Sequence, residues 1–415
     1  MNDKKDKQNV CKLQIKDFGE IVTGSTPPTA LNKYWKGDFC FYSPSDFSDN
    51  TYCNKTEKTI TLLGLKQGRE IPINSVMVTC IASIGKLAIN TKLGITNQQI
   101  NTIIVNQNFD SKYIYYLLCK NIDQIKNSAA QTSVPIINKT DFGNIELFVN
   151  YNKKEQGHIA QILTTCDKVI EQTEAVIAKY KAIKQGMLHD LFTRGLDKNG
   201  KLRPTQTEAP ELYKESELGL IPKEWEVKRL SECCKIQCSY GINAPAVDYD
   251  SKLPLYLRIT DITEDGSYNK NGRKCVNSIN SNQYILNEDD IVFARTGATV
   301  GKTYLYKTED GKLVYAGFLI KFSPDPNLLN SYFLKSYTET PQYWDWVNIY
   351  SQRSGQPGIN GNEYASLLLP YPIIDEQNQL AYRFTVIDIN IKNEVNLFDK
   401  YKKIKLGLMN RLLTT

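Results

Sequence analysis

Residues 155–193 read EQGHIAQILTTCDKVIEQTEAVIAKYKAIKQGMLHDLFT, and residues 376–414 read EQNQLAYRFTVIDINIKNEVNLFDKYKKIKLGLMNRLLT. The two stretches align without a gap, at an offset of 221 residues, and they are identical at fourteen positions. Self-similarity over so long a segment indicates an internal repeat. The chain is therefore expected to contain two versions of one structural unit.

The apolar residues of both stretches recur three or four positions apart, as in helices that bury one face. The pattern predicts two long helices, 153–193 and 375–415, that pack on each other along a coiled-coil seam. At about 1.5 Å per residue each helix would span about 60 Å, which is longer than one compact domain needs. Two core helices of a single domain would share this spacing, but both stretches are polar outside the seam, which favours a spacer. The predicted seam and partner-facing positions are Ile159, Ile162, Val169, Val176, Tyr180, Ile183, Ile387, Tyr401 and Ile404.

The repeat continues on the N-terminal side of each helix. VPIIN (134–138) corresponds to QPGIN (356–360), and YSPSDF (42–47) corresponds to LRITDI (257–262). Each half therefore predicts a mixed α/β (α+β) domain followed by its long helix. Between the halves, a polar stretch that contains Gly and Pro predicts a linker. The expected boundaries are a first domain at 1–152, a first helix at 153–193, a linker at 194–225, a second domain at 226–374 and a second helix at 375–415.

ARTGATVGKTYL (294–305) looks like a phosphate-binding loop, but its glycines are one residue too close for the G-x-x-x-x-G-K-[ST] pattern that wraps phosphates. The residues that follow, TYLYK (303–307), alternate as in a strand, whereas a phosphate loop opens a helix. The corresponding residues of the first half, SIGK (83–86), lack the first glycine. We therefore predict a turn between two strands, in which glycine supplies a positive φ, and not an ATPase loop.

The composition permits a nucleic-acid partner without proving one. The chain has 415 residues, a net charge of +6 and 25 Tyr, and an AT-rich genome would give a similar abundance of Tyr, Asn and Gln. It has ten Cys and two His without a C-x-x-C pair, so we expect buried reduced thiols and no metal site. It has no apolar signal segment and no run of eighteen apolar residues, so we expect a cytoplasmic protein without membrane contact.

The order of these segments resembles a known family. A variable domain, a long helix, a linker ending in LGLIPKEWEVKRL (218–230), a second variable domain and a second long helix are similar to the specificity subunit of type I restriction–modification systems. TGSTPPT (23–29) and DIVFARTGATVGK (290–302) also look like that family, and the resemblance covers nearly the whole chain.

The resemblance implies two target recognition domains, each of which reads one half of a split, asymmetric sequence in double-stranded DNA. They would be separated by two antiparallel coiled-coil helices, with an internal pseudo-twofold repeat. It implies two methyltransferase subunits docked on the helices and motor-nuclease subunits that complete the restriction enzyme. It also implies a non-catalytic subunit without a cofactor, and STPPTA (25–30) indeed differs from the [N/D]-P-P-[Y/F/W] motif of an adenine methyltransferase.

Base reading requires Arg, Lys, Asn or Gln donors on loops that reach the major groove. The polar loop SQRSGQ (351–356) and its counterpart SAAQTSV (128–134) offer such donors, as do the repeated motifs. Asp46 and Asp261 hold matching positions where they would instead cap a turn, and Trp225 is expected to seat the second domain on its helix. The predicted DNA-binding residues are Ser45, Lys86, Asn97, Gln98, Gln131, Thr132, Ser133, Arg258, Arg295, Thr296, Lys302, Gln352, Arg353 and Gln356.

Two other classes of function remain open at this point. A nuclease or NTPase with an unusual loop would bind ATP at Lys302, and the broken glycine spacing argues against it. A non-catalytic adaptor would bind protein partners through the same coiled coil without reading DNA. A steep salt dependence of DNA affinity would separate the DNA reader from the adaptor, because phosphate contacts release counterions.

Overall fold

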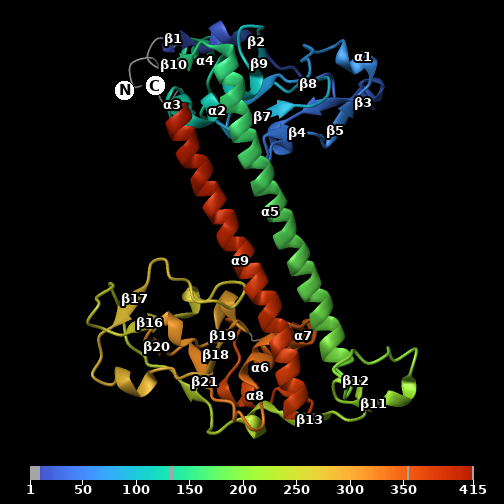
Figure 1. Ribbon diagram of the computed structural model, residues 1–415, viewed down its shortest axis with the longest axis vertical. Coiled ribbons are helices and arrows are strands. Elements are labelled where there is room, and N and C mark those ends of the chain that lie inside the picture. Colours follow the sequence, from blue (N-terminus) through green and yellow to red (C-terminus); the bar gives the residue numbers. More distant parts are fainter. Residues whose placement is uncertain (1–9, 130–133, 353–354, 414–415) are drawn as a thin grey trace. The chain divides into compact units, whose positions relative to one another are not determined.

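The computed structural model describes residues 10–129, 134–352 and 355–413 (Figure 1). They form two compact units, Met1–Ile177 with Asn393–Thr415, and Ala178–Lys392. Two long helices, α5 (Lys153–Thr193) and α9 (Ile374–Leu412), each contribute one end to each unit. The prediction of two mixed helix-and-sheet domains with two long helices is thereby confirmed.

The first unit contains three sheets, with strand orders β1-β10, β2-β9-β6-β7-β4 and β5-β3-β8. Most pairs are antiparallel, and β3–β8 and β4–β7 are parallel. Its strands are β1 (Val10–Gln14), β2 (Gly19–Thr23), β3 (Trp35–Tyr42), β4 (Tyr52–Cys53), β5 (Lys58–Ile60), β6 (Val76–Thr79), β7 (Leu87–Asn90), β8 (Gly94–Thr96), β9 (Ile100–Val105) and β10 (Glu146–Asn150). Its shorter helices are α1 (Leu62–Leu65), α2 (Ser111–Lys120), α3 (Ile122–Asn127) and α4 (Lys139–Asn144).

The second unit repeats this plan with strand orders β13-β22, β14-β21-β18-β19 and β15-β17-β16-β20, to which the linker adds the hairpin β11-β12. Its strands are β11 (Tyr213–Ser216), β12 (Gly219–Pro222), β13 (Glu226–Arg229), β14 (Ser239–Tyr240), β15 (Ala246–Val247), β16 (Leu255–Leu257), β17 (Lys274–Val276), β18 (Ile291–Ala294), β19 (Thr303–Leu305), β20 (Leu313–Tyr315), β21 (Leu319–Phe322) and β22 (Leu368–Tyr371). Its shorter helices are α6 (Ser331–Tyr337), α7 (Pro341–Tyr350) and α8 (Gly361–Ala365).

Each unit buries the beginning of one long helix against the end of the other, so the two helices run antiparallel within each unit. In the second unit Phe192 near the end of α5 stacks on Phe384 near the start of α9, with ring centroids 5.6 Å apart. Positions related by the repeat fill the same places in the first unit, where Leu163 corresponds to Phe384 and Leu413 to Phe192. The sequence repeat is therefore a repeat of core positions.

The predicted seam and partner-facing positions differ in burial. Ile159 and Ile387 are buried, at 8% and 7% exposed. Ile162, Ile183 and Ile404 lie on open surface, with exposures of 43%, 40% and 43%. The reason is that the sheet-containing domains also pack on the helices, so that neighbouring residues such as Leu163 face the core instead. The other predicted seam residues, Val169, Val176, Tyr180 and Tyr401, are partly buried.

The Glu-Gln pair that opens each repeat has a structural use. Gln156 and Gln377 are fully buried, and each side-chain oxygen accepts a hydrogen bond from the backbone N–H of a residue that caps a short helix. These capping residues are Asp110 before α2, at 2.8 Å, and Asn330 before α6, at 3.0 Å. Because a buried amide needs partners, this contact fixes each sheet-containing domain to its own long helix.

The glycine loop of 294–305 is a turn, as predicted. Gly297 and Gly301 have φ angles of +72° and +87°, and the loop leads from β18 into strand β19 instead of a helix. The corresponding loop of the first unit has Ala82 at φ +59° and Gly85 at φ +95°. The shared backbone shape supports the interpretation that this loop belongs to the fold.

Candidate DNA interface

The two units share one loop framework, defined by matching backbone hydrogen bonds. In the second unit the N–H of Arg295 donates to Phe318 at 3.0 Å, and the N–H of Ile359 donates to Arg295 at 2.9 Å. In the first unit Cys80 stands in place of Arg295, with the corresponding bonds from Cys80 to Gln99 at 2.7 Å and from Ile137 to Cys80 at 2.8 Å.

The framework joins three segments that are distant in the sequence. Gly241 donates to Leu319 at 3.1 Å, and Gly24 donates to Ile100 at 3.1 Å, so β14 and β2 also hold matching places. Tyr240, the last residue of β14, therefore corresponds to Thr23 of β2. The backbone is the same in both units, whereas the side chains mounted on it differ.

The predicted residues Arg295, Thr296 and Gln356 come together on this framework. Thr296 pairs with Gly358 in an isolated β-bridge, and the N–H of Gly297 donates to Pro357 at 3.0 Å. The side-chain amide of Gln356 lies against Gly297, because a Cβ placed there would be 3.0 Å from its Nε2. Gln356 and Pro357 thus lie over the turn that carries Arg295.

Two other predicted cations are held by carboxylates. Arg258 donates to both oxygens of Asp261, at 2.8 and 2.6 Å. Lys302 contacts Glu264 at 2.5 Å. The capping prediction for the aspartates is confirmed, because Asp261 and Asp46 each accept the backbone N–H three residues earlier, at 2.9 and 2.8 Å.

The first unit gathers polar amides and hydroxyls near the corresponding strand ends. Thr26 donates to Oε1 of the exposed Gln98 at 2.6 Å, and the side-chain amide of Asn97 donates to Gln99 at 3.0 Å. The N–H of Asn97 donates to the carbonyl of Tyr42 at 2.9 Å, next to the turn of the exposed Ser45.

Lys86 is exposed beyond β6, and Gln352 is exposed after α7. Gln131, Thr132, Ser133 and Arg353 lie outside the described residues.

A matched set of ionic contacts ties the helices together within each unit. In the first unit Lys405 contacts Asp167 at 2.5 Å, and the hydroxyl of Tyr116 donates to the same carboxylate at 2.6 Å. In the second unit Lys184 contacts Asp388 at 2.7 Å, and Tyr332 donates to that carboxylate at 2.8 Å. Lysine and aspartate hold the same positions of the repeat in both units, which explains their identity.

Lys184 also contacts Glu339 on the second recognition domain. Burial lowers the pKa of Lys184, but the two carboxylates of Glu339 and Asp388 outweigh that effect, so the pKa is raised above its ordinary value. Burial raises the pKa of Glu339, but Lys335 and Lys184 outweigh it and hold that pKa below its ordinary range. Lys184 and Glu339 are therefore charged at neutral pH.

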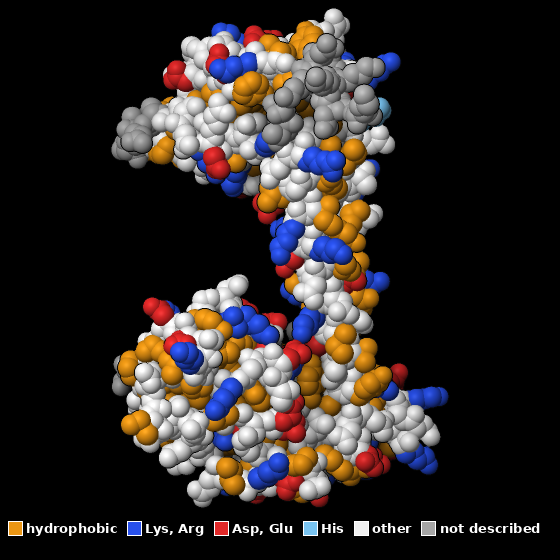
Figure 2. All heavy atoms as spheres, turned by 60° about the vertical axis from the view of Figure 1, so that its left-hand side comes forward, with side chains coloured by type: hydrophobic (Ala, Val, Ile, Leu, Met, Phe, Trp, Pro, Cys, Tyr) orange, Lys and Arg blue, Asp and Glu red, His pale blue; other side chains and the backbone are white. Residues whose placement is uncertain are grey.

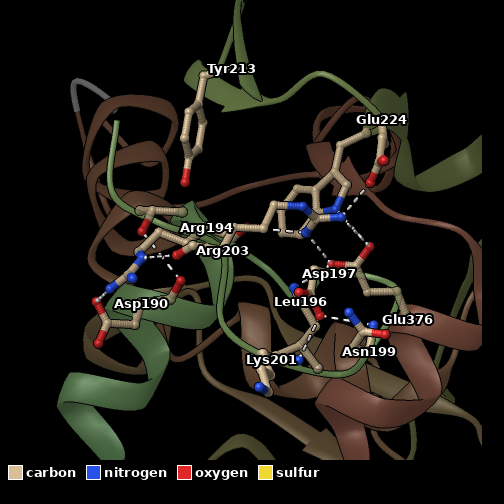
Figure 3. Close-up of polar contacts among 12 residues, drawn as sticks. Asp190, Arg194, Leu196, Asp197, Asn199, Lys201, Arg203, Tyr213, Glu224 and Glu376 are labelled. Atoms are coloured by element: carbon tan, nitrogen blue, oxygen red, sulfur yellow. Dashed lines mark hydrogen bonds and ion pairs between the residues drawn. The ribbon is translucent and has the colours of Figure 1, made fainter. Parts of the chain in front are cut away.

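The linker is anchored by a buried carboxylate that sequence reasoning did not identify (Figure 3). Glu376, 7% exposed, accepts from Arg203 at 2.7 Å, from the N–H of Leu196 at 2.7 Å and from the indole of Trp225 at 3.1 Å. Arg203 also donates to Glu224 at 2.6 Å. The predicted structural role of Trp225 is confirmed, since its side chain is fully buried. The available sequence signal for this site was that Glu155 and Glu376 are identical in the two copies of the repeat. The partner Arg203 gave no such signal, because it lies in the linker, outside the repeated stretches.

The surface is mixed in charge. On the face shown in Figure 2, Lys and Arg side chains lie among Asp and Glu side chains in both units. All ten cysteines are free thiols, half of them buried. Across the described ranges there is no group of three His, Cys, Asp or Glu residues placed to hold a metal. None of the described helices combines the length and the apolar character that crossing a membrane requires.

Comparison with known proteins gives a consistent result. Residues 7–181 and 222–397 each match the family model described as "Type I restriction modification DNA specificity domain". The chain is 28% identical over 300 residues to the type I restriction enzyme MjaIX specificity subunit of Methanocaldococcus jannaschii, over 69% of this chain and 66% of that relative. It is 22% identical over 418 residues to the MjaVIII specificity subunit of the same organism, over 97% and 91% of the two chains.

The fold is similar to a solved structure. It superposes with a TM-score of 0.62 on the crystal structure of a type I restriction–modification system S subunit from M. genitalium. The sequence identity is 17%, and the match covers 98% of this chain and 96% of that chain.

Proposed function

The chain belongs to the type I restriction modification DNA specificity family, and we propose that it is the non-catalytic subunit that selects the DNA target of a restriction–modification complex. The observation that carries the proposal is the shared loop framework with different side chains at matched positions, such as Arg295 and Cys80. Two similar readers with different side chains suit a bipartite, asymmetric target, because base edges in the major groove are distinguished by their donors and acceptors.

We place the DNA contacts on this framework and on the loops beside it. Amide and hydroxyl groups of the first unit suit an A-containing block, since Asn and Gln bind adenine in bidentate fashion. Other contacts to phosphates would set the register of the protein on the duplex. The proposed contact residues are Ser45, Lys86, Asn97, Gln98, Arg295, Thr296, Gln352 and Gln356, together with Gln131, Thr132, Ser133 and Arg353, which lie outside the described residues.

We propose that the exposed faces of α5 and α9 dock two methyltransferase subunits, and that motor-nuclease subunits complete the complex in the cytoplasm. In the second unit an apolar groove of about 630 Å³ runs between the helices, lined by residues that include Ile183, Tyr382 and Val386. Gly186 lies in the groove, and a Cβ added there would contact nothing, as at its repeat partner Gly407. Because glycine destabilises a helix by roughly 0.5–1 kcal/mol relative to alanine, two such open glycines suit close approach by a partner.

The test is a methylome. DNA would be sequenced by a long-read method from cells that contain the partner methyltransferase, with and without this chain. A new split motif, two short blocks around a fixed gap with adenine methylated in each, is the expected result. Identical methylomes, in cells where the complex is shown to assemble, would instead favour an adaptor that binds protein partners without reading DNA.

A further inference from the structure

We infer that Arg295 determines specificity in the second unit, where it binds a guanine of the block read by residues 226–374. The inference rests on the proposed function and deepens it, because it assigns one base to one side chain. It follows from how Arg295 is supported, from the absence of a carboxylate partner among the described residues, and from the residue at the matching place in the first unit.

Arg295 is held in place before any ligand binds. Its guanidinium carbon lies 5.0 Å from the ring centroid of Tyr240. That ring is itself fixed, because its hydroxyl accepts a hydrogen bond from the N–H of Gly361 at 2.8 Å. Arg295 is only partly buried, and both Tyr240, at the end of β14, and Phe318, just before β21, are exposed, at 41% and 57%. The side chain is therefore supported by an aromatic ring at the accessible end of β18, an inner strand of the sheet β14-β21-β18-β19.

The hydrogen-bonding capacity of Arg295 is unused. Its Nε is buried without a partner, and its terminal nitrogens make no hydrogen bond or ion pair with any described residue. Arg258 and Lys302, the other cations of the repeated motifs in this unit, are engaged by Asp261 and Glu264. An arginine that is held rigidly but has no carboxylate keeps its donors for a ligand. Unsatisfied buried donors of this kind are rare in proteins and call for an explanation.

The first unit supplies a natural contrast. The matching residue Cys80 is 2% exposed, and Thr23 stands where Tyr240 would support an arginine. The matched site of the first unit therefore has neither an arginine nor an aromatic ring to support one. A guanine contact built on this framework belongs to the second unit alone, which makes the two half-sites chemically different.

Guanine is the base that fits. In the major groove it presents two acceptors, N7 and O6, and a planar guanidinium donates to both at once. Cytosine and adenine present an amino donor at that edge, which a cation without an acceptor cannot satisfy. The exposed amide of Gln356, which lies over the same turn, is placed to contact a neighbouring base.

The experiment compares methylomes of the full chain, expressed with its methyltransferase partner, as wild type and as R295Q, R295K and R273Q. Arg273 is the matched control, because it is an exposed arginine of the same unit, 5.0 Å from the ring of Tyr249, outside the framework. R295Q and R295K are expected to relax one G·C position in the second block and to leave the first block unchanged. In competition binding, discrimination at that position should fall roughly five- to 150-fold. R273Q should leave the motif unchanged.

Several outcomes would overturn the inference. These are a second block without a G·C pair, undiminished stringency in both Arg295 variants, or the same relaxation in R273Q. Loss of assembly in both R295Q and R295K would assign Arg295 a structural role instead. A wild-type methylome without a split motif would be a failure of the proposed function itself, and it is distinguishable because it appears before any substitution is made.

Discussion

Glu376 shows how a single residue can hold a whole segment of chain. It is nearly inaccessible to solvent, and its oxygens accept from the side chains of Arg203 and Trp225 and from a backbone N–H. A buried charge is tolerated only when it is paired and hydrogen-bonded. The polar linker that the sequence predicts is therefore anchored to the start of α9.

Replacing Arg203 with alanine is expected to destabilise the second unit by about 3–5 kcal/mol, because Glu376 would remain buried without its cation. R203K should recover part of the loss, since lysine supplies the charge without the planar fork. Chemical denaturation of the full chain, followed by circular dichroism, measures the free energy of unfolding. Asp248→Asn removes the exposed contact with Lys274 and serves as the control that should change little. A stability of R203A within error of wild type would contradict the anchoring role.

Among the elements, the long helices α5 and α9 carry both packing and exposed apolar surface. Their ends are buried with the recognition domains, whereas Ile183 and Ile404 remain about 40% exposed at positions related by the repeat. Figure 2 also shows hydrophobic side chains along the surface of the helices. These two isoleucines are therefore accessible to a partner, as the proposed docking of methyltransferase subunits requires.

Ile183→Asp and Ile404→Asp are each expected to leave the chain folded and to weaken association with the methyltransferase subunit by roughly tenfold or more, since a charge would enter a desolvated interface. Titration of the purified subunit by calorimetry measures this affinity, and circular dichroism checks the fold. Gln185→Asp is the control, because two residues along a helix turn the side chain by about 200°, away from the groove. Equal affinities for wild type and both isoleucine variants would count against the docking surface.

At the scale of the whole molecule, the proposed function makes each recognition domain an independent reader of one half-site. Gln156 and Gln377 attach each domain to its own helix by the same contacts. A domain taken from another member of the family should therefore find an equivalent attachment site on the helix. Exchange of one domain should therefore preserve the rest of the chain.

Replacing residues 226–374 with the corresponding domain of another family member should change one block of the methylated motif and leave the other block as it was. The methylome of the exchanged chain, compared with that of wild type, measures this directly. The reciprocal exchange of residues 1–152 is the control and should change only the other block. A change in both blocks after either exchange would show that the readers are coupled.

The sequence by itself determined the repeat, the two long helices, the turn of 294–305 and the family, because periodicity, turn chemistry and repetition are properties of residues near one another in the chain. The tertiary structure alone decided which arginines and lysines remain available. Lys302 meets a glutamate 38 residues away, Arg203 meets Glu376 across 173 residues, and Arg295 meets no carboxylate among the described residues. The physical reason is that charge pairing depends on which side chains folding brings within a few ångströms, and spacing along the chain does not encode that distance.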